Sequence, residues 1–253
     1  MSKFKEKLTD RLHGRSARKA GALSVEGAAA RPPQPSLRTR QEVGISGPLP
    51  HTETTKPSAE AISLLEWAPL QVSEKVDLLL ASLGKKPAAM AAVLTPSWKV
   101  GEQPNRVDDD TTERIVFAAQ TLGLHTAVVD YTVDLGATAR PKGGGALQSY
   151  RQFMVSRSPE TLQQLVQVDK EVDDPDYNRR LGSLLGYPET ATAAFAAGQA
   201  VYPSAVSGYD AATLRFANFM CSANNMPAEL AVAHDWAAAV QEASPNLYHQ
   251  KIS

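Results

Sequence analysis

The spacing of apolar residues predicts two short helices near the start of the folded part of the chain. The first is stopped by Pro69, and its apolar residues are Ala61, Ile62, Leu64, Leu65 and Ala68. The second is capped by Ser73 and ends before Gly84. Its apolar residues recur at i, i+3, i+4 and i+7, namely Val76, Leu79, Leu80 and Leu83.

Three later runs of apolar and β-branched residues predict strands. They are 88–94, 126–133 and 150–155. A helix between the first two is expected to start at Asp110, with Glu113 three residues later, and to run to about Leu122. Strand, helix and strand in this order predict a right-handed parallel crossover unit, and the third run would extend the same sheet.

The rest of the chain predicts helices joined by short turns. Their expected starts are Ser158–Pro159, Asp174–Pro175, Pro188, Asp210 and Asn225 with Pro227, and the last helix reaches about Ala243. The predicted fold class is therefore α/β (α+β). We expect a small mixed or parallel sheet of about three strands, with flanking helices and a helical C-terminal part.

Charge and proline content separate the beginning of the chain from the rest. Residues 1–40 hold ten basic and three acidic residues, a charge of +7, so a formal net charge of −1 leaves −8 for the other 213 residues. A proline-rich segment with few large apolar side chains does not offset its ordering entropy, and we expect disorder over about 14–58. Phe4, Leu8 and Leu12 recur every four positions and predict a short basic amphipathic helix.

Three functions are open for this basic arm, residues 1–58. It is a tail that solubilises or contacts a protein partner, a surface for nucleic acid or an anionic membrane through residues 1–40, or an organelle transit peptide. Glu6 and Asp10 count against the transit peptide. The expected domains are the arm and a single α/β domain over 59–253, with a sheet-containing part (59–157) and a helical part (158–253).

Composition excludes several kinds of chemistry. Of the 253 residues, 43% are hydrophobic, 21% are charged and one is cysteine. One cysteine excludes an internal disulfide framework and any metal site with two thiolates from one chain. No apolar stretch approaches the ~18 residues that cross a bilayer. We therefore expect a cytoplasmic protein, or an imported one if the arm is a transit peptide, with neither cofactor nor metal.

The glycine triplet at 143–145 invites a phosphate-binding interpretation. Lys142 precedes Gly143, Gly144 and Gly145, whereas the lysine of a P-loop follows its glycines, and no helix start follows the triplet. A flexible connection between strands is favoured. An anion-contacting loop that also uses Arg140 stays open as the alternative.

Two acidic clusters and one thiol are weaker candidates. The clusters are Asp108, Asp109 and Asp110, then Asp169, Asp173, Asp174 and Asp176. Both lie at predicted helix starts, where carboxylates stabilise free amides without a metal, and capping is favoured. Cys221 and His234 lie on neighbouring predicted helices and could form a nucleophile–base pair. Core packing for Cys221 and a packing or hydrogen-bonding role for His234 are favoured.

Two motifs in the C-terminal third carry a resemblance. Residues 184–195 read Leu-Leu-Gly-Tyr-Pro-Glu-Thr-Ala-Thr-Ala-Ala-Phe, and residues 220–227 read Met-Cys-Ser-Ala-Asn-Asn-Met-Pro. Over about 178–250 the chain resembles an uncharacterised prokaryotic family with a Leu-Gly-Tyr-Pro-x-Cys-Cys signature and a later Pro-Cys-Ser-x-x-Cys-Pro element. Because that family has no established activity, the resemblance implies a fold more than a function.

The same motifs depart from the family at its cysteines. Members carry enough cysteines to suggest a metal or redox site, whereas Thr190 and Ala191 stand in place of the cysteine pair here. The resemblance therefore implies a cysteine-depleted version without the metal. From the residues alone, Gly186 ends one helix, Pro188 starts the next, and Tyr187 fills the junction of a tight helix–helix corner.

The leading hypothesis is a soluble binding or interaction module without a metal or a complete catalytic site. One alternative is an enzyme acting on a small phosphorylated or nucleotide substrate. It would use the strand ends near Thr95–Lys99 and Tyr131–Asp134 together with the 140–145 loop. The other alternative is nucleic-acid binding through the basic arm.

Overall fold

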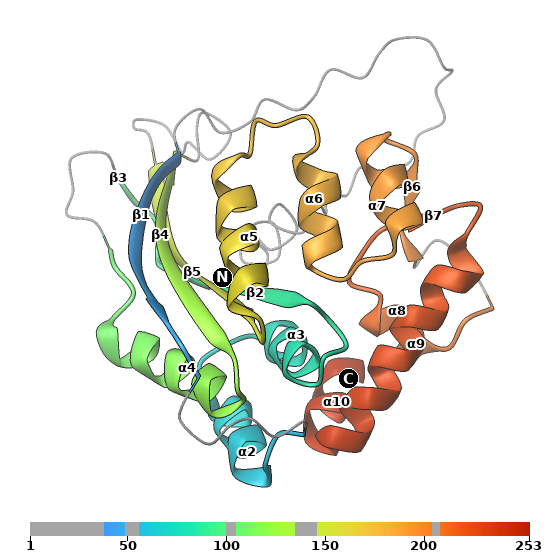
Figure 1. Cartoon of the computed structure of the whole chain (residues 1–253), viewed down its shortest axis with the longest axis horizontal. Coiled ribbons are helices and arrows are strands. Elements are labelled where there is room, and N and C mark those ends of the chain that lie inside the picture. Colours follow the sequence, from blue (N-terminus) through green and yellow to red (C-terminus); the bar gives the residue numbers. More distant parts are fainter. Residues whose placement is uncertain (1–37, 49–55, 100–104, 135–145, 204–207) are drawn as a thin grey trace. The chain divides into compact units, whose positions relative to one another are not determined.

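The chain is seen in a computed structural model that describes residues 38–48, 56–99, 105–134, 146–203 and 208–253 (Figure 1). The amphipathic helix predicted from Phe4 to Leu12 and the 140–145 loop lie outside these residues. The predicted mixture of helices and strands is confirmed. Within the described residues, no helix is long and apolar enough to cross a membrane.

The main sheet is antiparallel throughout, which corrects the prediction of a mixed or parallel sheet of about three strands. Its path is β1-β4-β5-β2, and the short β3 also pairs with β5. These strands are β1 (Arg38–Ser46), β2 (Ala88–Leu94), β3 (Trp98–Lys99), β4 (His125–Asp134) and β5 (Ala146–Ser156). Because β5 pairs antiparallel with both β2 and β4, those two strands run in the same direction but do not touch. The two strands of the predicted crossover unit, β2 and β4, are therefore not paired with each other, because β5 lies between them.

Strand β1 was not expected, and the prediction of disorder up to residue 58 is wrong over 38–46. This strand forms an antiparallel ladder with β4, with a register shift between Glu42 and Gly44. It is an edge strand, and its apolar residues Val43 and Ile45 are exposed. An edge strand with so little buried apolar surface leaves no periodic signal in the sequence.

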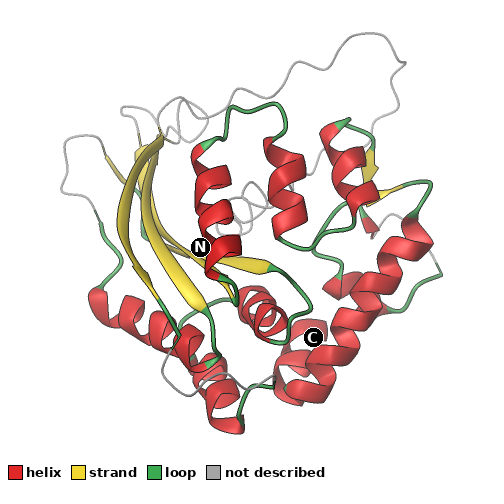
Figure 2. Cartoon of the chain, viewed as in Figure 1, coloured by secondary structure: helices red, strands yellow, loops and turns green. Residues whose placement is uncertain are grey.

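Successive side chains of a strand point to opposite faces of the sheet, and the apolar core is accordingly divided into two clusters. On β5, Phe153 and Val155 belong to one cluster, and Tyr150 and Met154 belong to the other. The first cluster packs against α2 (Ala59–Trp67), α3 (Val72–Ser82) and α4 (Asp109–Thr121), and the second against α5 (Pro159–Lys170). Figure 2 shows α5 beside the curved strands.

Two of these helix starts differ in detail from the prediction, and a third agrees with it. Asp108 caps α4 in place of Asp110 and accepts the Thr111 N–H. Gln71 caps α3 in place of Ser73 and forms a capping box with Glu74. The predicted serine cap of α5 is present, because Ser158 accepts the Thr161 N–H.

The C-terminal part adds helices and a small two-stranded sheet. The elements are α6 (Tyr177–Leu184), α7 (Glu189–Ala196), β6 (Ala200–Val201), α8 (Ala211–Phe216), β7 (Cys221–Ser222), α9 (Met226–Ala243) and α10 (Pro245–Ile252). Helix α10 was not predicted. Trp236, Val240 and Leu247 lie in the same apolar cluster as α3. The sheet-containing part and the helical part therefore share one core.

Candidate functional site

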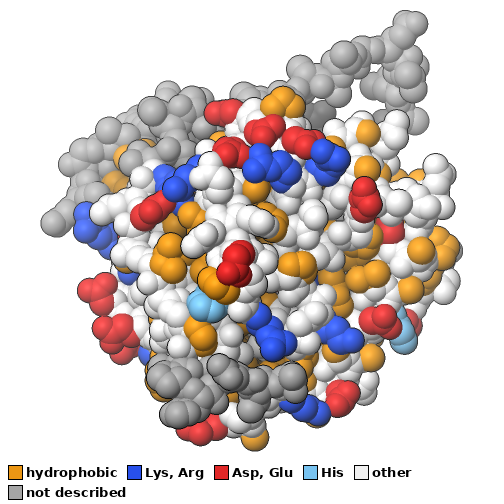
Figure 3. All heavy atoms as spheres, viewed as in Figure 1, with side chains coloured by type: hydrophobic (Ala, Val, Ile, Leu, Met, Phe, Trp, Pro, Cys, Tyr) orange, Lys and Arg blue, Asp and Glu red, His pale blue; other side chains and the backbone are white. Residues whose placement is uncertain are grey.

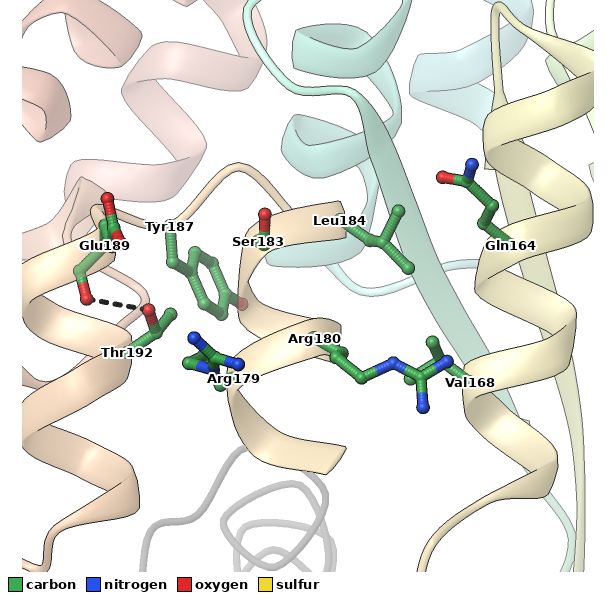
Figure 4. A pocket seen from close by; sticks show the side chains of 9 residues that line it. All are labelled: Gln164, Val168, Arg179, Arg180, Ser183, Leu184, Tyr187, Glu189 and Thr192. Atoms are coloured by element: carbon green, nitrogen blue, oxygen red, sulfur yellow. Dashed lines mark hydrogen bonds between the residues drawn. The ribbon is translucent and has the colours of Figure 1, made fainter. Parts of the chain in front are cut away.

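Helices α5, α6 and α7 enclose a groove of about 550 Å³. Figure 4 shows its lining side chains: Gln164, Val168, Arg179, Arg180, Ser183, Leu184, Tyr187, Glu189 and Thr192. The groove lies where the two apolar clusters meet, because Leu184 packs on the α5 cluster and Tyr187 on the other. Its size falls within the roughly 300–1,000 Å³ of ordinary ligand sites.

A close contact between α6 and α7 builds one wall of the groove. Gly182 faces Thr192, and a Cβ at this glycine would overlap the Thr192 side chain. Gly186 follows α6 with φ +74°, and a Cβ there would lie 2.8 Å from Pro87 Cδ. Pro188 then caps α7. The helix–helix corner is present at the residues where the sequence predicts it.

Tyr187 connects this corner to a buried ion pair. Its ring packs on Phe219, with centroids 5.6 Å apart, and Lys86 Nζ lies 5.2 Å from the Tyr187 ring centroid. Lys86 Nζ also lies 4.5 Å from the Trp236 ring centroid and 2.6 Å from Asp77 Oδ1. Burial raises the pKa of the Tyr187 phenol, so it stays neutral.

Two arginines project from α6 at the groove, and both are held by carboxylates. Arg179 donates to both carboxylate oxygens of Asp176, and Arg180 Nη1 donates to Glu171 and to Asp174. These bonds raise the pKa of both guanidinium groups. Asp176 is the N-cap residue of α6 but makes no side-chain capping bond. The prediction that this acidic cluster serves helix capping is therefore wrong for Asp176, which binds Arg179 instead.

The thiol candidate is buried beside a carboxylate. Glu229 accepts bonds from Thr190 Oγ1 at 2.5 Å and from the Ser222 N–H at 2.7 Å. Burial, and then the charge of Glu229, raise the pKa of Cys221 to about 12. The thiol is therefore protonated near neutral pH and a poor nucleophile. The two motifs of the family resemblance meet here, at Thr190 and Cys221.

The structure gives His234 a different partner from Cys221. Its Nδ1 lies 3.4 Å from Thr213 Oγ1, at the start of α8. The predicted packing or hydrogen-bonding role fits this contact. The alternative nucleophile–base pair finds no contact between the two residues in the described part of the chain.

A buried polar cluster on the α5 side of the sheet was missed at the sequence level. Arg40 Nε donates to Tyr131 Oη at 3.1 Å and to Asp169 Oδ2 at 3.4 Å, and Gln152 Nε2 donates to Asp169 Oδ1. Tyr131 also donates to Asp169 and stacks on Tyr150 with centroids 5.0 Å apart. Arg40 Nη2 is buried and has no hydrogen-bond partner among the residues that the structure describes. The sequence predicted that Arg40 lies in a disordered arm and that Asp169 belongs to a helix-capping cluster. No sequence pattern indicated a contact between these two residues.

The anion-loop candidates cannot be placed. Arg140, Lys142, Gly143, Gly144 and Gly145 lie outside the described residues, in the connection between β4 and β5. Among the residues that are described, no three metal-ligating side chains lie together.

Two exposed aromatic side chains form a separate surface feature. Trp67 at the end of α2 is 78% exposed, and Phe117 on α4 is 48% exposed. Arg114 of α4 donates to the Trp67 carbonyl at 3.2 Å, which joins the two helices at this point. The α2–α4 surface therefore competes with the groove as a contact site.

No family model, curated protein or solved structure matches this chain. The resemblance in the C-terminal third therefore stays a prediction.

Proposed function

We propose that this chain is an interaction module that holds a segment of a protein partner in the α5–α6–α7 groove. One observation carries the proposal: a groove of about 550 Å³ combines apolar side chains with charged groups of both signs. Val168, Leu184 and the Tyr187 ring offer apolar contact, and Arg179 and Glu189 stand at the edges. Grooves between helices that present both kinds of surface bind amphipathic segments.

The chemistry of the buried groups favours binding over catalysis. Glu229 is satisfied by donors from two other elements, Asp77 is paired with Lys86, and Cys221 stays protonated. Each of these groups is engaged by neighbours inside the fold. None of them lines the groove itself.

A photo-crosslinking amino acid placed at Ser183 tests the proposal in an extract of the host cell. Ser183 is exposed and lines the groove, and we expect a discrete adduct with a protein partner. The same amino acid at Phe195, which is exposed on α7 but does not line the groove, should give none. Ser183→Trp fills the groove and should abolish capture of that partner by the tagged chain. Undiminished capture by this variant would contradict the proposal.

A second candidate function, binding or turnover of a small phosphorylated ligand, is favoured by one observation. The strand ends near Thr95–Lys99 and Tyr131–Asp134 lie at the same end of the sheet, because β3 and the end of β4 both pair with the start of β5. The Arg40 cluster joins β1, β4, β5 and α5, with Tyr131 near this end of the sheet, and among the described residues Arg40 Nη2 has no hydrogen-bond partner. A nucleotide that stabilises the parent chain but not an Arg140→Ala/Lys142→Ala variant would support this candidate. No thermal shift with a panel of nucleotides and sugar phosphates would remove it.

A further inference from the structure

The outer edge of β1 offers unpaired backbone groups. Strand β1 forms a ladder with β4 on one side, and no strand of the described chain pairs with its other side. Alternate residues of an edge strand point their N–H and C=O groups away from the sheet. Residues 41–45 are all exposed, so solvent reaches this edge. A further strand can therefore add to β1 through main-chain hydrogen bonds.

A small apolar hollow lies beside this edge, between β1 and α5. Its volume is about 150 Å³, and it is lined by Glu42, Gly44, Ile45, Ala127, Val128, Val129 and Val166. The lining residues of β4 and α5 are buried, whereas those of β1 are exposed. Figure 3 shows apolar side chains at the surface over the elements that Figure 1 labels β1 and α5. The hollow is smaller than the roughly 300 Å³ of an ordinary ligand site, so it has room for a side chain and not for a whole ligand.

The irregularity in β1 leaves the hollow open towards the edge. The register of β1 against β4 shifts between Glu42 and Gly44. Before the shift Glu42 pairs with Val129, and after it Ile45 pairs with Ala127. Because paired residues share a face of the sheet, Glu42 and Ile45 flank the hollow. Gly44 lies between them without a side chain, and a Cβ there would meet no atom within 4 Å. A side chain of an added strand can therefore enter at this point.

The charged residue at the mouth of the hollow is already paired. Glu42 Oε1 lies 2.7 Å from Arg40 Nη1 and 2.9 Å from Lys170 Nζ. Hydrogen bonds from Arg40 and Lys170 lower the pKa of Glu42 to about 2, so it is ionised at neutral pH. The other lining residues are uncharged. An apolar side chain therefore fits the hollow better than a charged one, whose lost hydration no group in the lining would offset.

We infer that β1 takes up an extended segment of a protein partner, which adds a strand to the sheet and places one large apolar side chain in the hollow. The open edge selects an extended backbone, because a helix has no free main-chain groups to offer along its length. Because the bulge interrupts the edge, main-chain pairing alone is short, and the inserted side chain decides which segment binds.

This contact is separate from the α5–α6–α7 groove. Val166 of α5 lines the hollow beside β1, whereas Gln164 and Val168 line the groove. Residues two positions apart lie on opposite sides of a helix, so α5 stands between the two surfaces. A segment in the hollow therefore leaves the groove free.

Short labelled peptides test the inference by fluorescence anisotropy. The first is uncharged, alternates threonine with valine and carries leucine at its centre, and the second has aspartate in place of that leucine. We expect the leucine peptide to bind at least about ten-fold more tightly, because the hollow buries leucine and gives a carboxylate no partner. N-methylation of alternate amides should weaken the leucine peptide in one of the two phases only, since every second amide faces β1.

Four variants locate the binding. Ala127→Leu fills the hollow from β4, and Ile45→Asp places a charge at its mouth on an exposed residue; both should abolish binding of the leucine peptide. Phe195→Asp changes an exposed apolar residue of α7 in the same way and should leave the affinity unchanged. Ser183→Trp, which fills the α5–α6–α7 groove, should also leave it unchanged. No binding by the parent chain, equal binding of the two peptides, or equal loss in Ile45→Asp and Phe195→Asp would overturn the inference.

A second copy of this chain is the competing occupant of the edge. Sedimentation of the parent chain and of Ile45→Asp at matched concentrations tells the two apart. The inference predicts the same mass for both proteins. A dimer of the parent chain that Ile45→Asp dissociates would overturn the inference and assign the edge to β1 of the second copy.

Discussion

At the scale of single residues, the buried carboxylates of this fold differ in their hydrogen-bond and charge partners. Asp77 has an ammonium partner in Lys86, and Glu229 accepts from Thr190 and from the Ser222 amide. Within the described residues, Glu74 accepts two backbone N–H groups, from Gln71 and Ala92, and burial raises its pKa to about 7. The charge of the Glu74 carboxyl therefore responds to pH near neutrality.

Glu74 should make the protein less stable as pH rises. The folded state keeps this proton up to about pH 7, whereas the unfolded chain releases it near the ordinary glutamate pKa of 4.5. The folded state thus binds more protons between these values, and the unfolding free energy falls across that window. We expect the unfolding free energy of the Glu74→Gln variant to fall by roughly 3 kcal/mol less than that of the parent chain across this window.

Denaturant unfolding of the parent chain and of Glu74→Gln between pH 4 and 8 measures this effect, with both proteins in the same buffers. The difference in unfolding free energy between them should change through the window and level off above it. A difference that stays constant with pH would show that Glu74 is ionised at the same pH in both states.

Cys221 should be inert in the folded protein. With a pKa of about 12, it holds little thiolate at pH 8 and is buried as well. We expect a disulfide reagent to label it more than a hundred-fold more slowly than it labels the guanidinium-unfolded chain. Rapid labelling under native conditions would mean that β7 opens or that the thiol is activated.

At the scale of elements, the sequence predicts what depends on local signals. Helix starts at Ser158 and Asp210, and the Gly186 corner, rest on capping and turn chemistry within a few residues, and these are present. Strand pairing depends on distant parts of the chain. The parallel unit was expected because 88–94 and 126–133 flank a helix, and nothing local shows that β5 returns between them.

In the candidate site too, local features were predicted and long-range contacts were not. The sequence indicated Tyr187 and its corner, but it gave no sign that α5 would lie across from α6 to form a groove. The Arg40–Asp169 cluster joins residues 129 positions apart, and two polar residues so far apart carry no periodic signal. Long-range juxtaposition of polar side chains is what single-sequence patterns leave out.

The corner between α6 and α7 can be tested with two glycines of similar backbone conformation. Gly186 has φ +74° and Gly198 has φ +70°, but only at Gly186 would a Cβ meet a neighbour, at 2.8 Å. Gly198→Ala should cost about 1 kcal/mol for the left-handed conformation alone. Gly186→Ala should cost about 2–4 kcal/mol because Pro87 must also move.

Thermal and denaturant unfolding of these two variants give the comparison. Equal losses would mean that the corner has room for a Cβ and that Pro87 does not fix it. A larger loss at Gly186 would show that the α6–α7 wall is held against the β2 side of the fold.

At the scale of the whole molecule, two surfaces compete for the role of contact site. The α5–α6–α7 groove combines apolar and charged side chains in a hollow, whereas Trp67 and Phe117 project from α2 and α4. A projecting tryptophan is also an effective anchor in protein interfaces. The central claim, that the groove is the binding surface, therefore needs a measurement that reports on both surfaces at once.

Amide hydrogen exchange of the chain, alone and with the partner recovered by crosslinking at Ser183, makes that measurement. The account predicts slower exchange in α5, α6 and α7 when the partner is bound, and unchanged exchange in α2 and α4. Protection of α2 and α4 with no change around the groove would contradict it and assign the contact to Trp67 and Phe117.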